Sequence, residues 1–281
     1  MIATAVDAGW SFDPGALILL ALLGGLYARR FRRARRDARR RARGSIRIAL
    51  AHDAPMWRAW CYAGALAAIF AALVSPIDRL GAQLLVMHMV QHLLLLDVAP
   101  ILGILGFTRV ILRPVTRRVA EIEQALGPLA HPVFAAALYI VAMCVWHVPA
   151  MYDLALRHGG IHVLEHMSFG IAGGLYWWHL LSPIPMRHRL TGMGPVLYML
   201  VTKLFVGLLG IVITFAPESI YDFYGTRGPV WGMSPHTDQS VAGALMAIEQ
   251  SIVMGIALAW LFVRMLGESQ RADERAERYA G

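Results

Sequence analysis

Seven apolar segments of roughly membrane-spanning length divide this chain and constrain its fold more than any other feature. A helix needs about 20 apolar residues to cross a bilayer, and proline, glycine or charge separates neighbouring segments here. The 281 residues are 58% hydrophobic and 16% charged, with a mean hydropathy of +0.55. We therefore expect an all-α, polytopic membrane helix bundle with seven transmembrane helices. The segments lie at 12–28, 57–75, 81–105, 132–151, 160–181, 194–215 and 239–266.

The chain is expected to form a single membrane domain over residues 1–281. The first segment precedes its arginines, which is typical of a retained span rather than a cleaved signal. The two cysteines, Cys61 and Cys144, fall in different apolar segments. They are too few for a disulfide framework or a cysteine-rich metal site.

Arginine placement predicts the orientation. Of the 26 basic residues, 22 fall on alternate loops, twelve of them between residues 29 and 58. The opposite loops hold three, Arg79, Arg157 and Arg227, and Lys203 lies inside a span. By the positive-inside rule we expect the N-terminus outside and the C-terminus in the cytoplasm. The basic segment 29–56 and the tail 267–281 are then cytoplasmic. Anionic lipid is a second interpretation of this charge, and nucleic acid is not an expected partner.

Two histidine pairs lie at membrane depth. The stretch 87–106, MHMVQHLLLLDVAPILGILG, carries His88 and His92, and HGGIHVLEHMSF carries His162 and His166. In each pair the residues are four apart, so both rings share one face of a helix. Ionisable residues inside a membrane indicate function by default.

The predicted orientation gathers both pairs in one outer layer. His147 ends the fourth segment on that side, and Asp238 enters the seventh from it. Neutral imidazole suits copper, zinc, iron or nickel, and nearby sulfur ligands favour Cu(I). Interhelical hydrogen bonding between the histidines is the structural alternative. We expect the metal ligands to be His88, His92, His147, His162 and His166, supported by Met89, Cys144, Asp153, Glu165, Asp238 and Gln239.

Three further charged residues lie within spans. Lys203 and Glu249 sit at compatible depths in the sixth and seventh segments. We expect a mutual ion pair between them, with a proton or ion pathway as the alternative. Asp97 lies about 140° around the helix from His92, so it is expected to pair or cap away from the metal face.

Several ordered motifs resemble the polytopic bacterial CtaG family of cytochrome c oxidase assembly factors. They are the 87–106 stretch, WHVPAMYDLAL, HVLEHMSF with the following LYWW, and TDQSVAG, and the resemblance covers roughly residues 55–265. The family motifs fall on His88, His92, Trp146, His147, His162, Glu165, His166, Asp238, Gln239 and Gly243.

The resemblance implies a seven-span protein of the bacterial plasma membrane that helps to build a haem–copper oxidase. Copper supply is the implied role, and no catalytic activity is expected. The implied partners are the oxidase subunits, a periplasmic copper donor and the lipid bilayer. Zinc and iron rank behind copper as the expected metal.

Other classes of protein use similar motifs. HVLEH fits the H-x-x-E-H zinc-protease signature, with Glu165 as general base. Paired H-x-x-x-H motifs also occur in di-iron enzymes, so a membrane metalloenzyme is the alternative function. A haem-binding electron carrier and a copper transporter are further interpretations. The haem carrier would place one axial histidine on each of two helices. The transporter would need polar groups that continue into the cytoplasmic half of the membrane.

Overall fold

The computed structural model describes residues 6–42, 45–226 and 228–280. These residues are 80% helical and contain no β-strand, which confirms the predicted all-α class. In chain order the elements are α1 (Pro14–Arg41), α2 (Ile46–Asp53), α3 (Met56–Leu73), α4 (Pro76–Gly81), α5 (Leu85–Leu93), the π-helical η1 (Leu94–Val98), α6 (Ala99–Leu105), α7 (Arg109–Leu126), the 3-10 helix η2 (Gly127–Ala130), α8 (Pro132–Trp146), α9 (Pro149–Arg157), α10 (Gly159–Leu181), α11 (Gly194–Thr214), α12 (Asp222–Gly225) and α13 (Pro235–Ala280).

By length and composition, five helical segments of the described chain can cross a membrane. They are Pro14–Arg41, Ile46–Leu73, Leu85–Leu105, Gly194–Thr214 and Pro235–Trp260. Each overlaps a predicted apolar segment, although Pro14–Arg41 and Ile46–Leu73 extend into the basic segment predicted at 29–56. A sixth arises if Arg109–Ala130 and Pro132–Trp146, which meet at 67°, count as one broken span.

The other two predicted segments fold into helices that, taken singly, are not both long enough and apolar enough to count as spans. In place of 132–151 the chain forms α8, which has 15 residues and ends at Trp146, before α9 begins. In place of 160–181 it forms α10, which is 23 residues long. Three histidines and one glutamate lower the mean hydropathy of α10. The structure therefore supports five or six spans, and seven remains a prediction.

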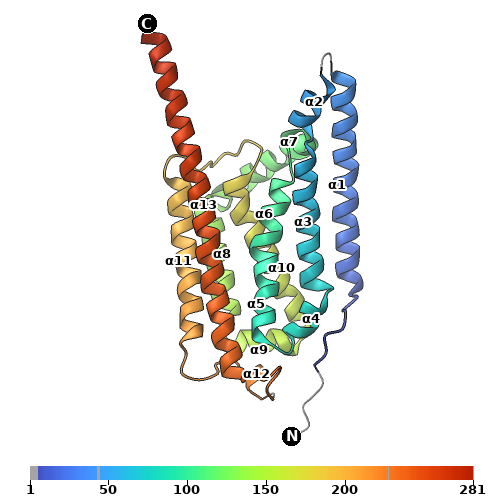
Figure 1. Cartoon of the computed structure of the whole chain (residues 1–281), viewed down its shortest axis with the longest axis vertical. Coiled ribbons are helices and arrows are strands. Elements are labelled where there is room, and N and C mark those ends of the chain that lie inside the picture. Colours follow the sequence, from blue (N-terminus) through green and yellow to red (C-terminus); the bar gives the residue numbers. More distant parts are fainter. Residues whose placement is uncertain (1–5, 43–44, 227, 281) are drawn as a thin grey trace.

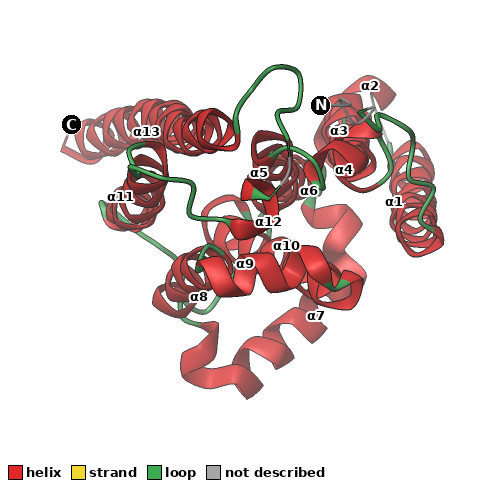
Figure 2. Cartoon of the chain, turned by 90° about the horizontal axis from the view of Figure 1, so that it is seen from below, coloured by secondary structure: helices red, strands yellow, loops and turns green. Residues whose placement is uncertain are grey.

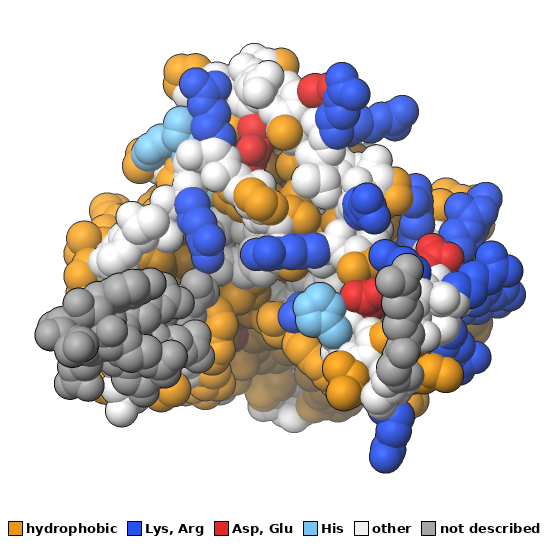
Figure 3. All heavy atoms as spheres, turned by 90° about the horizontal axis from the view of Figure 1, so that it is seen from above, with side chains coloured by type: hydrophobic (Ala, Val, Ile, Leu, Met, Phe, Trp, Pro, Cys, Tyr) orange, Lys and Arg blue, Asp and Glu red, His pale blue; other side chains and the backbone are white. Residues whose placement is uncertain are grey.

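The basic residues gather at one end of the bundle. The arginine-rich end of α1, α2 and α7 lies at the top in Figure 1, and Figure 3 shows Lys and Arg spread over this face. Arg79 and Arg157 belong to α4 and α9 at the opposite end. Arg227 and the side chains of Arg264 and of the tail arginines lie outside the described residues. This distribution agrees with the charge asymmetry of the sequence, and the orientation itself stays a prediction.

The span α5–η1–α6 runs through the middle of the bundle. Figure 2 shows it with α11 and α13 on one side and α1 and α3 on the other, and it contacts α3, α4, α10 and α13. Large apolar side chains such as Val141, Phe205 and Ile256 are exposed on the outside of the bundle. Such faces suit contact with lipid rather than water. The polar groups of the central span are buried instead.

One glycine brings α10 against the central span. A Cβ placed on Gly173 would overlap the carbonyl oxygen of Leu96 in η1, whereas a Cβ on Gly174 meets nothing within 4 Å. Small residues let membrane helices approach closely. Because α10 also carries Glu165 and His166, this contact fixes the distance between two helices that build the polar centre described below.

Replacing Gly173 should therefore loosen the bundle. We expect Gly173→Ala to lower the stability of the detergent-purified protein by about 1–3 kcal/mol, the usual cost of overpacking. Gly174→Ala is the matched control and should be neutral or stabilising by up to about 1 kcal/mol, because alanine favours helix. Thermal unfolding measures both. Equal effects of the two substitutions would contradict the close approach at Gly173.

Candidate metal centre

Three helices bring the predicted histidines together. His88 and His92 lie one turn apart on α5, with ring centroids 4.3 Å apart. His162 and His166 repeat this spacing on α10, with centroids 4.2 Å apart. The two pairs face each other, since the centroids of His88 and His162 are separated by 5.2 Å. His147 follows the end of α8, with its ring centroid 5.9 Å from that of His92.

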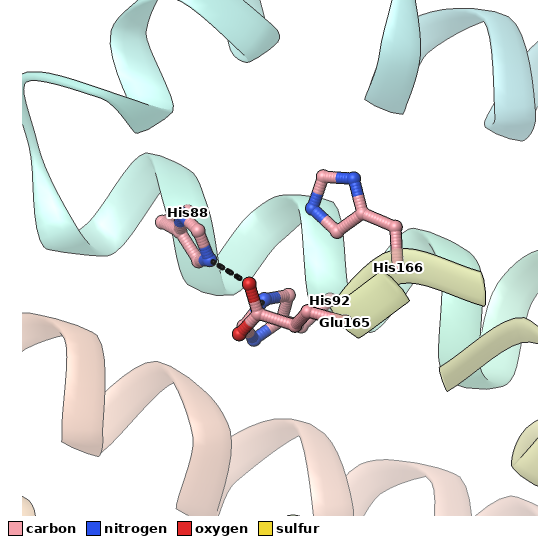
Figure 4. Close-up of side chains that lie close together, drawn as sticks. All are labelled: His88, His92, Glu165 and His166. Atoms are coloured by element: carbon pink, nitrogen blue, oxygen red, sulfur yellow. Dashed lines mark ion pairs between the residues drawn. The ribbon is translucent and has the colours of Figure 1, made fainter. Parts of the chain in front are cut away.

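Four side chains have the arrangement of a metal centre. His88, His92, Glu165 and His166 each offer one ligand atom, and these atoms all lie within 4.8 Å of one another. Figure 4 shows the Glu165 carboxylate beside the two rings of α5, with His166 on the next residue of α10. Glu165 Oε1 lies 3.3 Å from His92 Nε2, and Oε2 lies 3.6 Å from His88 Nε2. Glu165, predicted as a supporting residue, therefore lies among the ligand atoms.

The centre is buried, and the contacts between its histidines and Glu165 are not aligned as hydrogen bonds. His88 and Glu165 have no exposed surface, and His92 is 2% exposed. Among the described residues, both ring nitrogens of His88 and His92 and both oxygens of Glu165 lack a partner with hydrogen-bond geometry. The Nε2 atoms of His162 and His166 also lack a hydrogen-bond partner among these residues. Buried polar groups are normally hydrogen-bonded, so this cluster fits a bound cation.

His147 is held in one tautomer beside this group. Its Nδ1 lies 2.7 Å from the carbonyl oxygen of Met143, which can only accept, so Nδ1 carries the proton. Its Nε2 lies 3.4 Å from Met89 Sδ. Tyr221 donates to the carbonyl of His147 at 3.3 Å. Burial raises the pKa of Tyr221, so its hydroxyl stays a donor.

Trp146 ties the end of α8 to α10. Its Nε1 donates to Ser168 Oγ at 2.7 Å, and Ser168 Oγ donates to the carbonyl oxygen of Glu165 at 2.7 Å. This chain of bonds links His147 to the helix turn that carries the Glu165 carboxylate. The sequence motif contains Trp146 but gives no sign that Ser168 is its partner.

The predicted supporting residues have other contacts. Asp238 of α13 accepts from the backbone N–H of Leu85 at 2.6 Å and of Val86 at 3.1 Å. It thus caps the first turn of α5, whose amides have no partner within the helix. Gln239 accepts from Ile220 N at 2.8 Å. Both residues position elements rather than orienting histidine rings.

Asp153 and Cys144 are not members of the four-residue ligand group. Asp153 accepts from the backbone N–H of Phe223 at 3.2 Å. Cys144 is a free, exposed thiol. His147, which caps the C-terminus of α8, is buried instead. The supporting role expected of Cys144 stays a prediction.

Lys203 pairs with Asp97 rather than with Glu249, its predicted partner. Lys203 Nζ lies 3.0 and 2.9 Å from the two oxygens of Asp97 and 2.7 Å from Tyr139 Oη. Trp177 Nε1 also donates to Asp97, at 2.6 Å. Asp97 lies in the π-helical turn η1, which changes the angle at which its side chain leaves the helix. Asp97 thus pairs away from the metal face, as expected, and Glu249 instead accepts from Gln250.

Breaking this buried pair should be costly. We expect Lys203→Met to destabilise the purified protein by about 3–5 kcal/mol, because it leaves Asp97 charged and unpaired. Adding Asp97→Asn should recover most of that loss. Chemical unfolding in detergent provides the measurement. If the loss of stability in the double variant equalled the sum of the losses in the two single variants, the residues would not act as a pair.

Together the fold and the centre define a helical membrane protein with a buried histidine–carboxylate cluster. The chain belongs to the cytochrome c oxidase caa3 assembly factor family (Caa3_CtaG), whose profile matches residues 25–268. This confirms the resemblance found in the sequence.

Curated relatives are distant and longer. An uncharacterized protein of Mycobacterium leprae, ML1998, is 22% identical over 238 residues, which cover 77% of this chain and 35% of the relative. Uncharacterized protein Mb0105 of Mycobacterium bovis is 22% identical over 247 residues, which cover 80% of this chain and 36% of the relative. The chain thus spans about a third of the length of these relatives. No solved structure matches the chain.

Proposed function

We propose that this protein is a non-enzymatic assembly factor that binds copper and aids its delivery to a haem–copper cytochrome c oxidase. The copper ligands are drawn from His88, His92, Glu165 and His166. The family supports the biological process. The partners are the oxidase subunits and a copper donor on the periplasmic side of the bacterial plasma membrane.

The observation that carries this proposal is the unsatisfied buried cluster. Four ligand atoms from α5 and α10 lie within 4.8 Å of one another, and the imidazole nitrogens of His88 and His92 lack aligned hydrogen-bond partners among the described residues. Simple interhelical hydrogen bonds between the histidines, the structural alternative, would leave fewer such atoms. A metal ion would satisfy several of them at once, because each neutral imidazole offers a lone pair.

Copper is the metal that we propose, and the donor set is compatible with it. Imidazole nitrogen binds Cu more tightly than the other divalent metals of the first row. The thioether of Met89 lies 3.4 Å from His147 Nε2, beside the cluster, and soft sulfur favours Cu(I) further. The carboxylate of Glu165 supplies negative charge to a buried cation, which would otherwise be costly at membrane depth.

A burial gradient on α10 supports access from the predicted outer side. His158 at the start of the helix is exposed, whereas His162 and His166 are partly buried and Glu165 is fully buried. The three histidines lie four residues apart and so follow one face. We infer that an ion enters along this face and reaches the rings of α5 last.

Removing the α5 pair should remove the metal. We expect His88→Ala/His92→Ala to lower copper content by about one ion per chain after reductive loading and desalting, because ligand loss removes binding energy. Mass spectrometry of the detergent-purified protein measures the metal. His52→Ala/His188→Ala, at the basic end of the bundle, is the control and should retain copper.

The same experiment separates the alternatives. A wild-type protein that stays copper-free under reducing and oxidising conditions would contradict the proposal. Retained zinc or iron, with Glu165→Gln abolishing function but not metal content, would favour the membrane metalloenzyme. A Soret band in the absorbance spectrum would favour the haem carrier. In cells, the α5 variant should yield oxidase that is deficient in copper.

A further inference from the structure

A small cavity, lined mostly by buried side chains, adjoins the histidine cluster. It leaves about 20 Å³ open to the centre of a water-sized sphere, which is room for about one water molecule or small ion. Its walls come from α5, η1, α8 and α13, and His92 forms part of them. The cavity therefore shares one side chain with the candidate metal centre.

Three methionines from three helices line this cavity. Met89 of α5, Met143 of α8 and Met246 of α13 are 3, 3 and 7% exposed. Methionine commonly fills gaps in apolar cores, and Met199, which is 1% exposed, has such a role away from this cavity. Three methionines that line a space for one small ion are a different arrangement.

The contact between Met89 and His147 points to a cation. His147 Nδ1 donates to the Met143 carbonyl oxygen, so the Nε2 of the neutral ring carries no proton. This Nε2 lies 3.4 Å from Met89 Sδ, which also has only lone pairs. Two acceptors that face each other gain nothing from the contact. A soft cation bound in the cavity would give the Met89 sulfur a partner for its lone pairs.

Two carboxyl groups also line the cavity. Asp97 and Glu249 both line it. Asp97 is neutralised by Lys203, which lies 2.9 Å away. Glu249 Oε1 has no hydrogen-bond partner among the described residues. A monovalent cation next to Glu249 would therefore cost less than an isolated charge at membrane depth.

We propose that this cavity is a second copper site, specific for Cu(I), in which Met89, Met143 and Met246 supply thioether ligands and His92 connects it to the histidine centre. Thioether ligands select Cu(I). The ion moves as Cu(I), so no electron is transferred, and each copper–nitrogen bond that breaks is replaced by a copper–sulfur bond. The inference rests on the proposed function for the identity of the metal.

X-ray absorption at the copper edge tests this site on the full-length protein loaded anaerobically with two equivalents of Cu(I). We expect nitrogen and sulfur scattering shells in the wild type, and about two copper ions retained per chain, one at each site. Met143→Leu/Met246→Leu should lose the sulfur shell and one copper ion, because leucine keeps the volume but has no donor atom. Met199→Leu is the matched control and should resemble the wild type.

The readouts distinguish this inference from the proposed function. His88→Ala/His92→Ala tests the nitrogen ligands, whereas the methionine variants test the sulfur ligands. A wild type with copper bound by nitrogen and no sulfur shell overturns the second site and leaves the first. The second site is also overturned if the double leucine variant keeps its sulfur shell. Should that variant unfold, Met246→Leu alone replaces it and must weaken the sulfur shell.

Discussion

A bilayer offers no hydrogen-bond partner to a polar group, so the protein itself must supply one. The two polar clusters on the central span differ in how far it does so. The Asp97–Lys203 cluster is complete, because Tyr139 and Trp177 also bond to the carboxylate. The histidine cluster is incomplete, since buried ring nitrogens and carboxylate oxygens lack aligned partners among the described residues. A closed polar network stabilises a fold, whereas an unsatisfied one in a membrane indicates a functional site. The contrast supports the proposal that the histidine cluster is that site.

The span α5–η1–α6 makes both clusters possible. Its α-helical part holds His88 and His92 on one face, and Asp238 caps its first turn from α13. Its π-helical turn then directs Asp97 toward Lys203 on α11. On the facing helix, Gly173 allows the approach that places Glu165 among the histidines. A rigid scaffold on several helices suits a site that must hold its ligands in place.

Much of this arrangement could be predicted from the sequence, because helix periodicity and apolar length are local properties. The four-residue spacing predicted that His88 and His92 share one face of a helix. The charge asymmetry predicted that the histidine segments lie in one layer. Two features could not be predicted in this way. The π-helical turn η1 places Asp97, rather than Glu249, beside Lys203. The polar residues of α10 also left the span count below the predicted seven.

Copper bound between α5 and α10 is the proposal on which the function depends, and an anomalous difference map at the copper edge is its decisive test. Crystals of the copper-loaded protein would provide the data. We expect a strong peak in contact with the rings of His88, His92 and His166. A map without a peak there, and with copper at the exposed thiol of Cys144 or on the surface, would contradict the proposal.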